Sequence, residues 1–179
     1  MRLPPTPLLL AVLLSLSQCK KTDADPTSQL PSATQTGANT FGCLVNGQPW
    51  TPQGNDGASN YTVVLDQSMN GNTLDIHTYR IYGQAPNELQ AMVLFATQLK
   101  GLGTYSLRSP QRTRASFEYQ KTRCYWSTRD SATTYRQGNL TLTRFDLKAG
   151  IVSGTFSFTL YKQGCDSVRV TQGRFDKKL

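Results

Sequence analysis

The chain has 179 residues, of which 17% are charged and 37% hydrophobic, and its formal net charge is +8. This length fits one domain with a short extension, and the abundant Thr, Ser, Gln, Tyr and Gly are typical of an exported β protein rather than a cytoplasmic helical enzyme. No segment has 18 consecutive apolar residues, so the sequence predicts no membrane-spanning helix.

The amino terminus resembles a bacterial lipoprotein signal peptide. A positively charged start precedes the apolar run Leu8–Leu16, which is too short to span a hydrocarbon core about 30 Å thick. The segment Leu16–Cys19 (LSQC) resembles the lipobox that lipoprotein signal peptidase recognises, although Gln18 stands where a small residue is usual. The resemblance implies removal of residues 1–18 and a lipid anchor on Cys19 in the cell envelope. We expect the outer membrane, with its periplasmic and surface faces both open.

Residues 19–40 are predicted to form a lipidated, flexible tether. After Cys19 the segment holds two prolines, one leucine and no aromatic residue. With so little apolar surface to bury, such a polar segment does not order itself. The domain is therefore expected over residues 41–179, which are enough for a core of their own.

The predicted domain begins with short β segments separated by turns. Phe41–Val45 runs into Asn46-Gly47, which is the strongest two-residue hairpin signal. Tyr61–Asp66 is rich in β-branched residues, and a turn at 70–72 leads into a further strand over 73–82.

Residues 87–100 fit two secondary structures. Asn87 and Gln90 could form a helix capping box, with Gly101 as the helix stop. The segment also alternates as a strand, whose one face would carry Leu89, Ala91, Val93, Phe95 and Leu99. The strands expected on both sides favour the strand.

The C-terminal part alternates regularly between apolar and polar residues. Between Val152 and Leu160 the apolar side chains point one way, and Gly154 fills one inward place, where we expect another group to approach closely. A last strand begins at Val168 and ends near Phe175. Strands at this spacing without intervening helices predict an all-β fold, either a single antiparallel β-sandwich or a barrel-like domain.

Three segments are similar to exported lipoproteins of unknown function from the Bacteroidota. They are Phe41–Trp50 (FGCLVNGQPW), the stretch GNLTLTRFDLKAGIVSGTFSFTL from Gly138, and Val170–Phe175. Their motifs consist of turns and alternating strands. The resemblance therefore implies a β-rich exported domain and no particular activity.

Three cysteines are left for an oxidising compartment once Cys19 is reserved for lipid. We predict a disulfide between Cys124 and Cys165, because both lie toward the ends of strands in the second half of the chain. Cys43, in an apolar strand, is then expected to be a buried thiol. No CxxC motif occurs and His77 is the only histidine, so no metal site or cofactor is predicted.

A basic segment interleaved with aromatic residues is the best candidate for ligand binding. Residues 108–136 carry seven Arg and Lys side chains and only two carboxylates. Guanidinium groups beside aromatic rings hold phosphate, sulfate or carboxylate groups and stack on sugars. The predicted ligand-binding residues are Arg112, Arg114, Arg123 and Trp126. The alternative is that these arginines lie on exposed strand faces and serve solubility.

An enzyme site has little support in the sequence. His77 follows Asp75 by two residues, as a Ser-His-Asp arrangement could use, but no GxSxG nucleophile elbow is present. Glu88 and Glu118 are the only glutamates, and neither lies in a local acid–base motif. We therefore expect a protein without catalytic activity and an exposed strand histidine.

Two tripeptides resemble the O-glycosylation sequence of exported Bacteroidota proteins. They are Asp130-Ser131-Ala132 and Asp166-Ser167-Val168. The resemblance implies Ser131 and Ser167 as candidate modification sites, which the intact mass after export would test.

The sequence thus predicts a noncatalytic cell-envelope lipoprotein whose β domain binds an anionic glycan or an acidic protein surface. Nucleic acid is not an expected partner of an exported, membrane-tethered domain, and the oligomeric state stays open. Two alternatives are a small extracytoplasmic hydrolase, built from residues that only folding brings together, and a purely structural envelope component.

Overall fold

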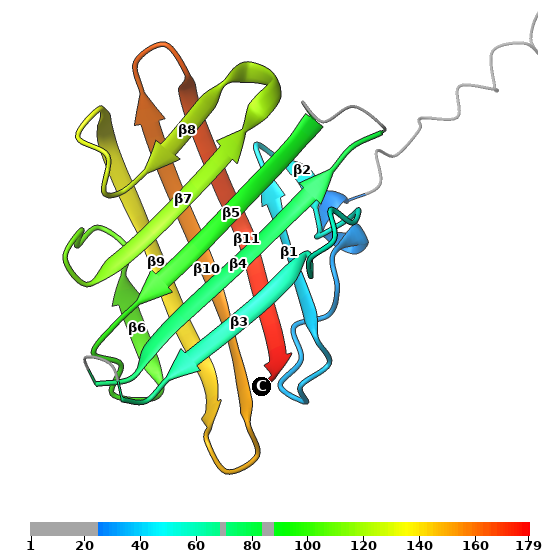
Figure 1. The fold of residues 1–179 in the computed structure, drawn as a ribbon, viewed down its shortest axis with the longest axis vertical. Coiled ribbons are helices and arrows are strands. Elements are labelled where there is room, and N and C mark those ends of the chain that lie inside the picture. The colour runs from blue at the N-terminus through cyan, green and yellow to red at the C-terminus, as the bar shows by residue number, and fades with distance from the viewer. Residues whose placement is uncertain (1–24, 69–70, 84–87) are drawn as a thin grey trace, which may run out of the picture.

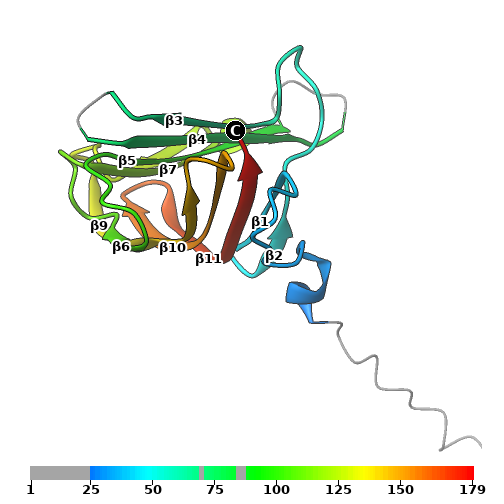
Figure 2. The same ribbon diagram turned by 90° about the horizontal axis from the view of Figure 1, so that it is seen from below.

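The computed structural model, which describes residues 25–68, 71–83 and 88–179, consists of two antiparallel β-sheets packed face to face (Figure 1). Figure 2 shows the two layers from below. The predicted all-β fold is confirmed, and of the two expected architectures it is the sandwich. The predicted signal peptide of residues 1–18 and the lipid-bearing Cys19 lie outside the described residues. No helix in the described ranges is long and apolar enough to cross a lipid bilayer.

The first sheet has six strands. They are β1 (Thr40–Val45), β2 (Gln48–Trp50), β6 (Gly103–Ser106), β9 (Thr133–Asp146), β10 (Ile151–Lys162) and β11 (Asp166–Lys178). Their order is β2-β1-β11-β10-β9-β6, and all neighbours are antiparallel. The β1–β2 hairpin turns at Asn46 and Gly47, both with positive φ, as this residue pair predicts.

The second sheet has five strands. They are β3 (Tyr61–Asp66), β4 (Thr73–Ile81), β5 (Leu89–Ala96), β7 (Thr113–Tyr119) and β8 (Cys124–Ser127). Their order is β3-β4-β5-β7-β8, again with antiparallel neighbours.

Strand β5 resolves the ambiguity for Leu89–Ala96, whereas Asn87, the expected capping residue, lies outside the described residues. The strand, rather than the helix, is the structure observed. Met92 and Leu94 are buried in the core, whereas Val93 and Phe95 alternate with them and stay partly exposed. The apolar row that contains Val93 and Phe95 is therefore on the outer face of this strand. Phe95 thus lies on the outer surface of the second sheet.

The core between the sheets is filled from alternate strand positions. On β10 the buried apolar side chains alternate with Ser and Thr, as predicted. A Cβ on Gly154 would lie 2.3 Å from the carbonyl oxygen of Thr141 and 2.8 Å from the ring of Phe175. This close approach of backbone and ring confirms the expectation for Gly154 and explains why no side chain stands there.

The cysteines behave as predicted. Cys124 and Cys165 form a disulfide with their Cα atoms 5.6 Å apart, and Cys43 is a buried free thiol. The disulfide joins the start of β8 in one sheet to the turn between β10 and β11 in the other, so it links the two layers. Burial raises the pKa of the Cys43 thiol far above its ordinary value.

Residues 25–40 do not form the flexible segment that their composition predicts. A short 3-10 helix, η2 (Pro26–Gln29), is followed by Leu30, which is buried. Residues 30–38, which we call the N-terminal strap, then run along the six-stranded sheet to β1. The predicted flexible tether is therefore wrong over residues 25–40, while residues 19–24 lie outside the described residues.

The strap is ordered by one carboxylate of β11. Asp176 accepts hydrogen bonds from the backbone N–H groups of Thr36 (2.9 Å), Gly37 (2.9 Å) and Ala38 (3.0 Å), and from the hydroxyl of Thr34 (2.6 Å). Burial alone would raise the pKa of Asp176, but the hydrogen bonds outweigh burial and hold the pKa well below its ordinary value. The composition of the strap predicts disorder because the segment has little apolar surface to bury. It contains no sign of the distant carboxylate of Asp176, which orders the strap through hydrogen bonds.

Candidate functional site

The predicted binding residue Trp126 belongs to the core. Its side chain is only 6% exposed, its ring lies 6.1 Å from that of Phe117, and its indole N–H donates to the carbonyl oxygen of Asp166 at 3.1 Å. Strand β8 alternates, so its neighbour Tyr125 is the aromatic residue that faces solvent. The prediction that Trp126 contacts a ligand is therefore wrong.

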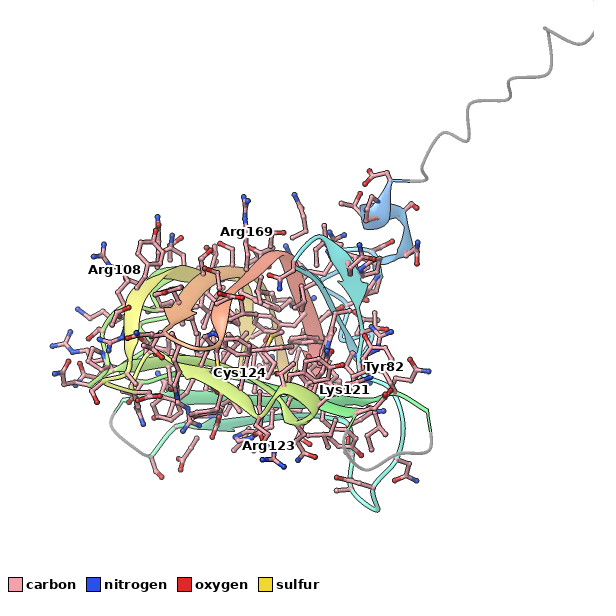
Figure 3. The ribbon with its side chains drawn as sticks, turned by 90° about the horizontal axis from the view of Figure 1, so that it is seen from above. Tyr82, Arg108, Lys121, Arg123, Cys124 and Arg169 are labelled. Carbon is pink, nitrogen blue, oxygen red and sulfur yellow. A yellow bond between two sulfur atoms is a disulfide. The ribbon has the colours of Figure 1, made fainter. Side chains whose placement is uncertain are left out.

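The predicted arginines do not form one site either. Arg112 directly precedes β7, whereas Arg123 follows it in the turn before β8. Seven strand residues separate them, which corresponds to more than about 20 Å. In Figure 3, Arg123 points away from the five-stranded sheet on the side opposite to Arg169. Arg123 is exposed, at the opposite end of β7 from Arg112 and Arg114.

Arg114 has a different set of neighbours from those predicted. It stands directly across from Phe95 on β5, and its guanidinium carbon lies 5.9 Å from the centre of that ring. The guanidinium carbon of Arg129, from the loop after β8, lies 5.0 Å from the same ring. The basic segment thus contributes two arginines to one aromatic side chain. Sequence reasoning missed Phe95 because it lies outside that segment.

A groove of about 860 Å³ lies on the outer face of the six-stranded sheet. Its lining consists mainly of short polar side chains from β6, β9, β10 and β11, among them Thr104, Asn139, Thr141, Thr155, Ser157 and Gln172. The hydroxyl oxygens of Thr104 and Thr141 are 2.9 Å apart. The register of β10 shifts against β11 beneath this groove, between Phe156 and Phe158, and such β-bulges bend and twist a sheet locally.

Beyond the groove, the outward rows of β9 and β10 lead to two exposed tyrosines. Tyr135 of β9 lies opposite Tyr161 of β10, and these residues are 48% and 39% exposed. Three further outward pairs connect them to the groove: Gln137 with Thr159, Asn139 with Ser157, and Thr141 with Thr155. We call these four pairs the polar face, which is about 20 Å long at the usual rise per strand residue.

Two arginines flank the polar face on β11. Arg169 is the cross-strand partner of Thr159, and Arg174 is that of Thr155. Within the described residues neither forms an ion pair with a carboxylate. Arg174 donates to the carbonyl oxygens of Gln172 at 3.2 Å and of Pro31 at 3.3 Å, so the strap helps to position its guanidinium group.

The polar face was not predicted from the sequence. The only local signal is the alternation of Ser and Thr along β10, which marks an outward row without showing its neighbours. Tyr135 and Tyr161 are 26 positions apart, and only the register of β9 with β10 brings them together.

Residues 65–177 match the model of a protein family described as a domain of unknown function, DUF6252. The chain belongs to this family. Neither a curated protein nor a solved structure matches it. The DUF6252 region contains all four pairs of the polar face and both flanking arginines, whereas the strap and the β1–β2 hairpin precede it.

The DUF6252 region also contains the candidate catalytic groups. His77 and Asp75 project from β4, with Nε2 and Oδ1 3.0 Å apart. Ser116 is in the same cross-strand row, but it lies two strands away from His77, at about 10 Å, which exceeds hydrogen-bond reach. In the part of the chain that the structure describes, no group of three or more His, Cys, Asp or Glu side chains is placed to hold a metal ion.

The two candidate O-glycosylation serines are both exposed. Ser131 lies in the turn between β8 and β9, and Ser167 is the second residue of β11. Exposure is what a modifying enzyme requires, and modification itself stays a prediction.

Proposed function

We propose that this DUF6252 protein is a lipoprotein of the cell envelope, held by lipid on Cys19, and that its domain binds an anionic glycan without catalysis. We place it at the outer membrane. The observation that carries the proposal is the continuity of the polar face, whose outward pairs on β9 and β10 run from the hydroxyl and amide groove to the exposed pair Tyr135 and Tyr161.

The groove suits the hydrogen-bonding chemistry of sugars. Hydroxyl groups such as those of Thr141, Thr155 and Ser157 both donate and accept, and the amide of Asn139 offers donors and an acceptor. A sugar hydroxyl has the same dual character, so such a surface can satisfy it in several orientations. An acidic protein surface would call for more cations than the groove lining offers, and we therefore favour a glycan.

The tyrosine pair adds a second mode of contact. Tyr135 and Tyr161 are direct cross-strand neighbours, on strands about 4.8 Å apart, and the hydroxyl of Tyr135 donates to the side-chain oxygen of Gln137. An exposed tyrosine offers an apolar ring together with a polar hydroxyl, as amphipathic ligands require. The apolar face of a sugar ring can pack on this pair.

The flanking arginines support a negatively charged glycan. Arg169 and Arg174 have no carboxylate partner in the described residues, and guanidinium groups bind carboxylates and sulfates through paired hydrogen bonds. Acidic groups on the glycan would supply the missing partners.

A glycan array probed with the full-length chain in nonionic detergent tests this function. We expect binding to acidic glycans at low salt, and a loss of about tenfold or more in affinity for Tyr161→Ala. Tyr125→Ala is the matched control, because Tyr125 is 41% exposed on the other sheet. No binding at low salt, or equal losses in the two variants, would refute the proposal.

A hydrolase is the competing function, and the pair of Asp75 and His77 is the observation that favours it. The bound glycans should stay intact during long incubation with the protein. If the native protein produces new reducing ends from the glycans and His77→Ala does not, the protein is a hydrolase and the proposed binding function is wrong.

A further inference from the structure

The outer face of the five-stranded sheet carries two guanidinium groups on one aromatic ring. Arg114 on β7 and Arg129 after β8 lie 5.9 and 5.0 Å from the centre of the Phe95 ring. An aromatic ring attracts cations through its negative face, so Phe95 holds both arginines in place. The ring does not neutralise their charges.

These two charges lack a carboxylate partner. Within the described part of the chain, neither Arg114 nor Arg129 forms an ion pair, and the Nε of Arg114 is buried with no hydrogen-bond partner. Asp75 lies across from Phe95 on β4, on the other side from Arg114, and its Oδ1 lies 3.0 Å from the Nε2 of His77. Two neighbouring cations repel each other, and a bound anion would remove that repulsion.

We propose that Phe95, Arg114 and Arg129 form a second binding site, which takes one oxyanion, the sulfate or phosphate ester of a glycan. The guanidinium groups donate to its oxygens, and paired N–H donors suit such tetrahedral anions. This site lies on the sheet opposite to the polar face, so it does not depend on the function proposed there. Arg112, two residues before Arg114, adds positive charge at the same end of β7.

The position of the site favours a glycan over the membrane that anchors the chain. In Figure 1 the start of β7 lies at the left of the domain, whereas η2, where the chain enters the domain, lies at its right. The two arginines are therefore at the end of the sandwich away from the proposed anchor, where ligands from the surroundings can approach.

Titration of the isotope-labelled full-length chain with inorganic sulfate, in nonionic detergent at constant ionic strength, tests the site. We expect the Nε–H resonances of Arg114 and Arg129 to shift and saturate, and Arg129→Gln to weaken binding about tenfold. Phe95→Leu keeps both charges and the strand but removes the ring, and it should weaken binding too. Arg123→Gln is the charge-matched control and should leave the affinity unchanged.

A loss in Arg123→Gln equal to that in Arg129→Gln would overturn the site, because net charge alone would then explain binding. Absence of saturable shifts would overturn it as well.

A second comparison uses a sulfated oligosaccharide, its unsulfated parent and vesicles containing phosphatidylglycerol. Arginine-dependent binding of the sulfated sugar supports the glycan, whereas arginine-dependent binding of the vesicles alone would replace the glycan by a lipid headgroup.

Discussion

Asp176 and Ser153 face each other on β11 and β10, and the hydroxyl of Ser153 donates a 2.7 Å hydrogen bond to the carboxylate of Asp176. Their side chains lie on the outer side of the sheet, yet Asp176 is only 1% exposed because the strap covers it. One carboxylate therefore connects the N-terminal strap, the last strand and its neighbour.

Replacing this carboxylate by an amide should destabilise the domain. Asp176→Asn keeps the size of the side chain but turns one acceptor into a donor, which faces the N–H groups of the strap. We expect the free energy of unfolding to fall by about 2–3 kcal/mol in urea denaturation. Asp166→Asn, at the exposed first residue of β11, where φ is positive, should cost little. Equal effects of the two substitutions would contradict the role assigned to Asp176.

The contribution of Asp176 should depend on pH. Its folded-state pKa is below the value of about 3.9 in an unfolded chain, so the unfolded state binds the proton more readily. The stabilisation is complete above about pH 5 and is lost as the pH falls through 4 toward the folded-state pKa. The difference in stability between the native chain and Asp176→Asn should therefore be constant above about pH 5 and shrink as the pH falls from about 5 to 3. A difference that stays constant down to about pH 3 would rule this linkage out.

The disulfide should be a large stabilising element. It closes a separation of 41 residues between Cys124 and Cys165, for which the chain-entropy model gives about 4 kcal/mol. The double variant Cys124→Ser, Cys165→Ser should unfold at a correspondingly lower urea concentration. A reducing agent should affect the native chain and leave the double variant unchanged; a further effect on the variant would point to another redox-sensitive bond.

Cys43 should resist alkylation in the native protein. Its thiol is buried and its pKa is raised, so little of the reactive thiolate forms at neutral pH and reagents have no access. Mass spectrometry after iodoacetamide treatment should show modification of Cys43 only once the protein is unfolded in denaturant. Rapid labelling without denaturant would show that β1 opens locally.

Much of the fold could be predicted from patterns among neighbouring residues in the sequence. The alternation along β10 and the Asn46-Gly47 turn each depend on neighbouring residues, and both predictions were confirmed. Trp126 shows the limit of such patterns, because in a four-residue strand alternation places Tyr125 and Trp126 on opposite faces without telling which face is inner.

The candidate sites could largely not be predicted from patterns among neighbouring residues. Tyr161 meets Tyr135, and Phe95 meets Arg129, only through the register and order of strands. The strap is even harder to predict from the sequence, because the hydrogen-bonded residues Thr34 and Asp176 are 142 positions apart and the composition of the strap favours disorder. Pairings over such separations are decided by the whole topology.

The ordered strap also limits where the domain can work. With lipid on Cys19, only six peptide units lead to Asp25, where the described structure begins, and they span at most about 20 Å. A fully flexible tether through residue 40 would allow a much longer excursion. With the proposed anchor, the part of the domain nearest the lipid along the chain would be η2, which contacts β2. The proposed anchor would therefore restrict the domain to ligands that diffuse to the membrane surface.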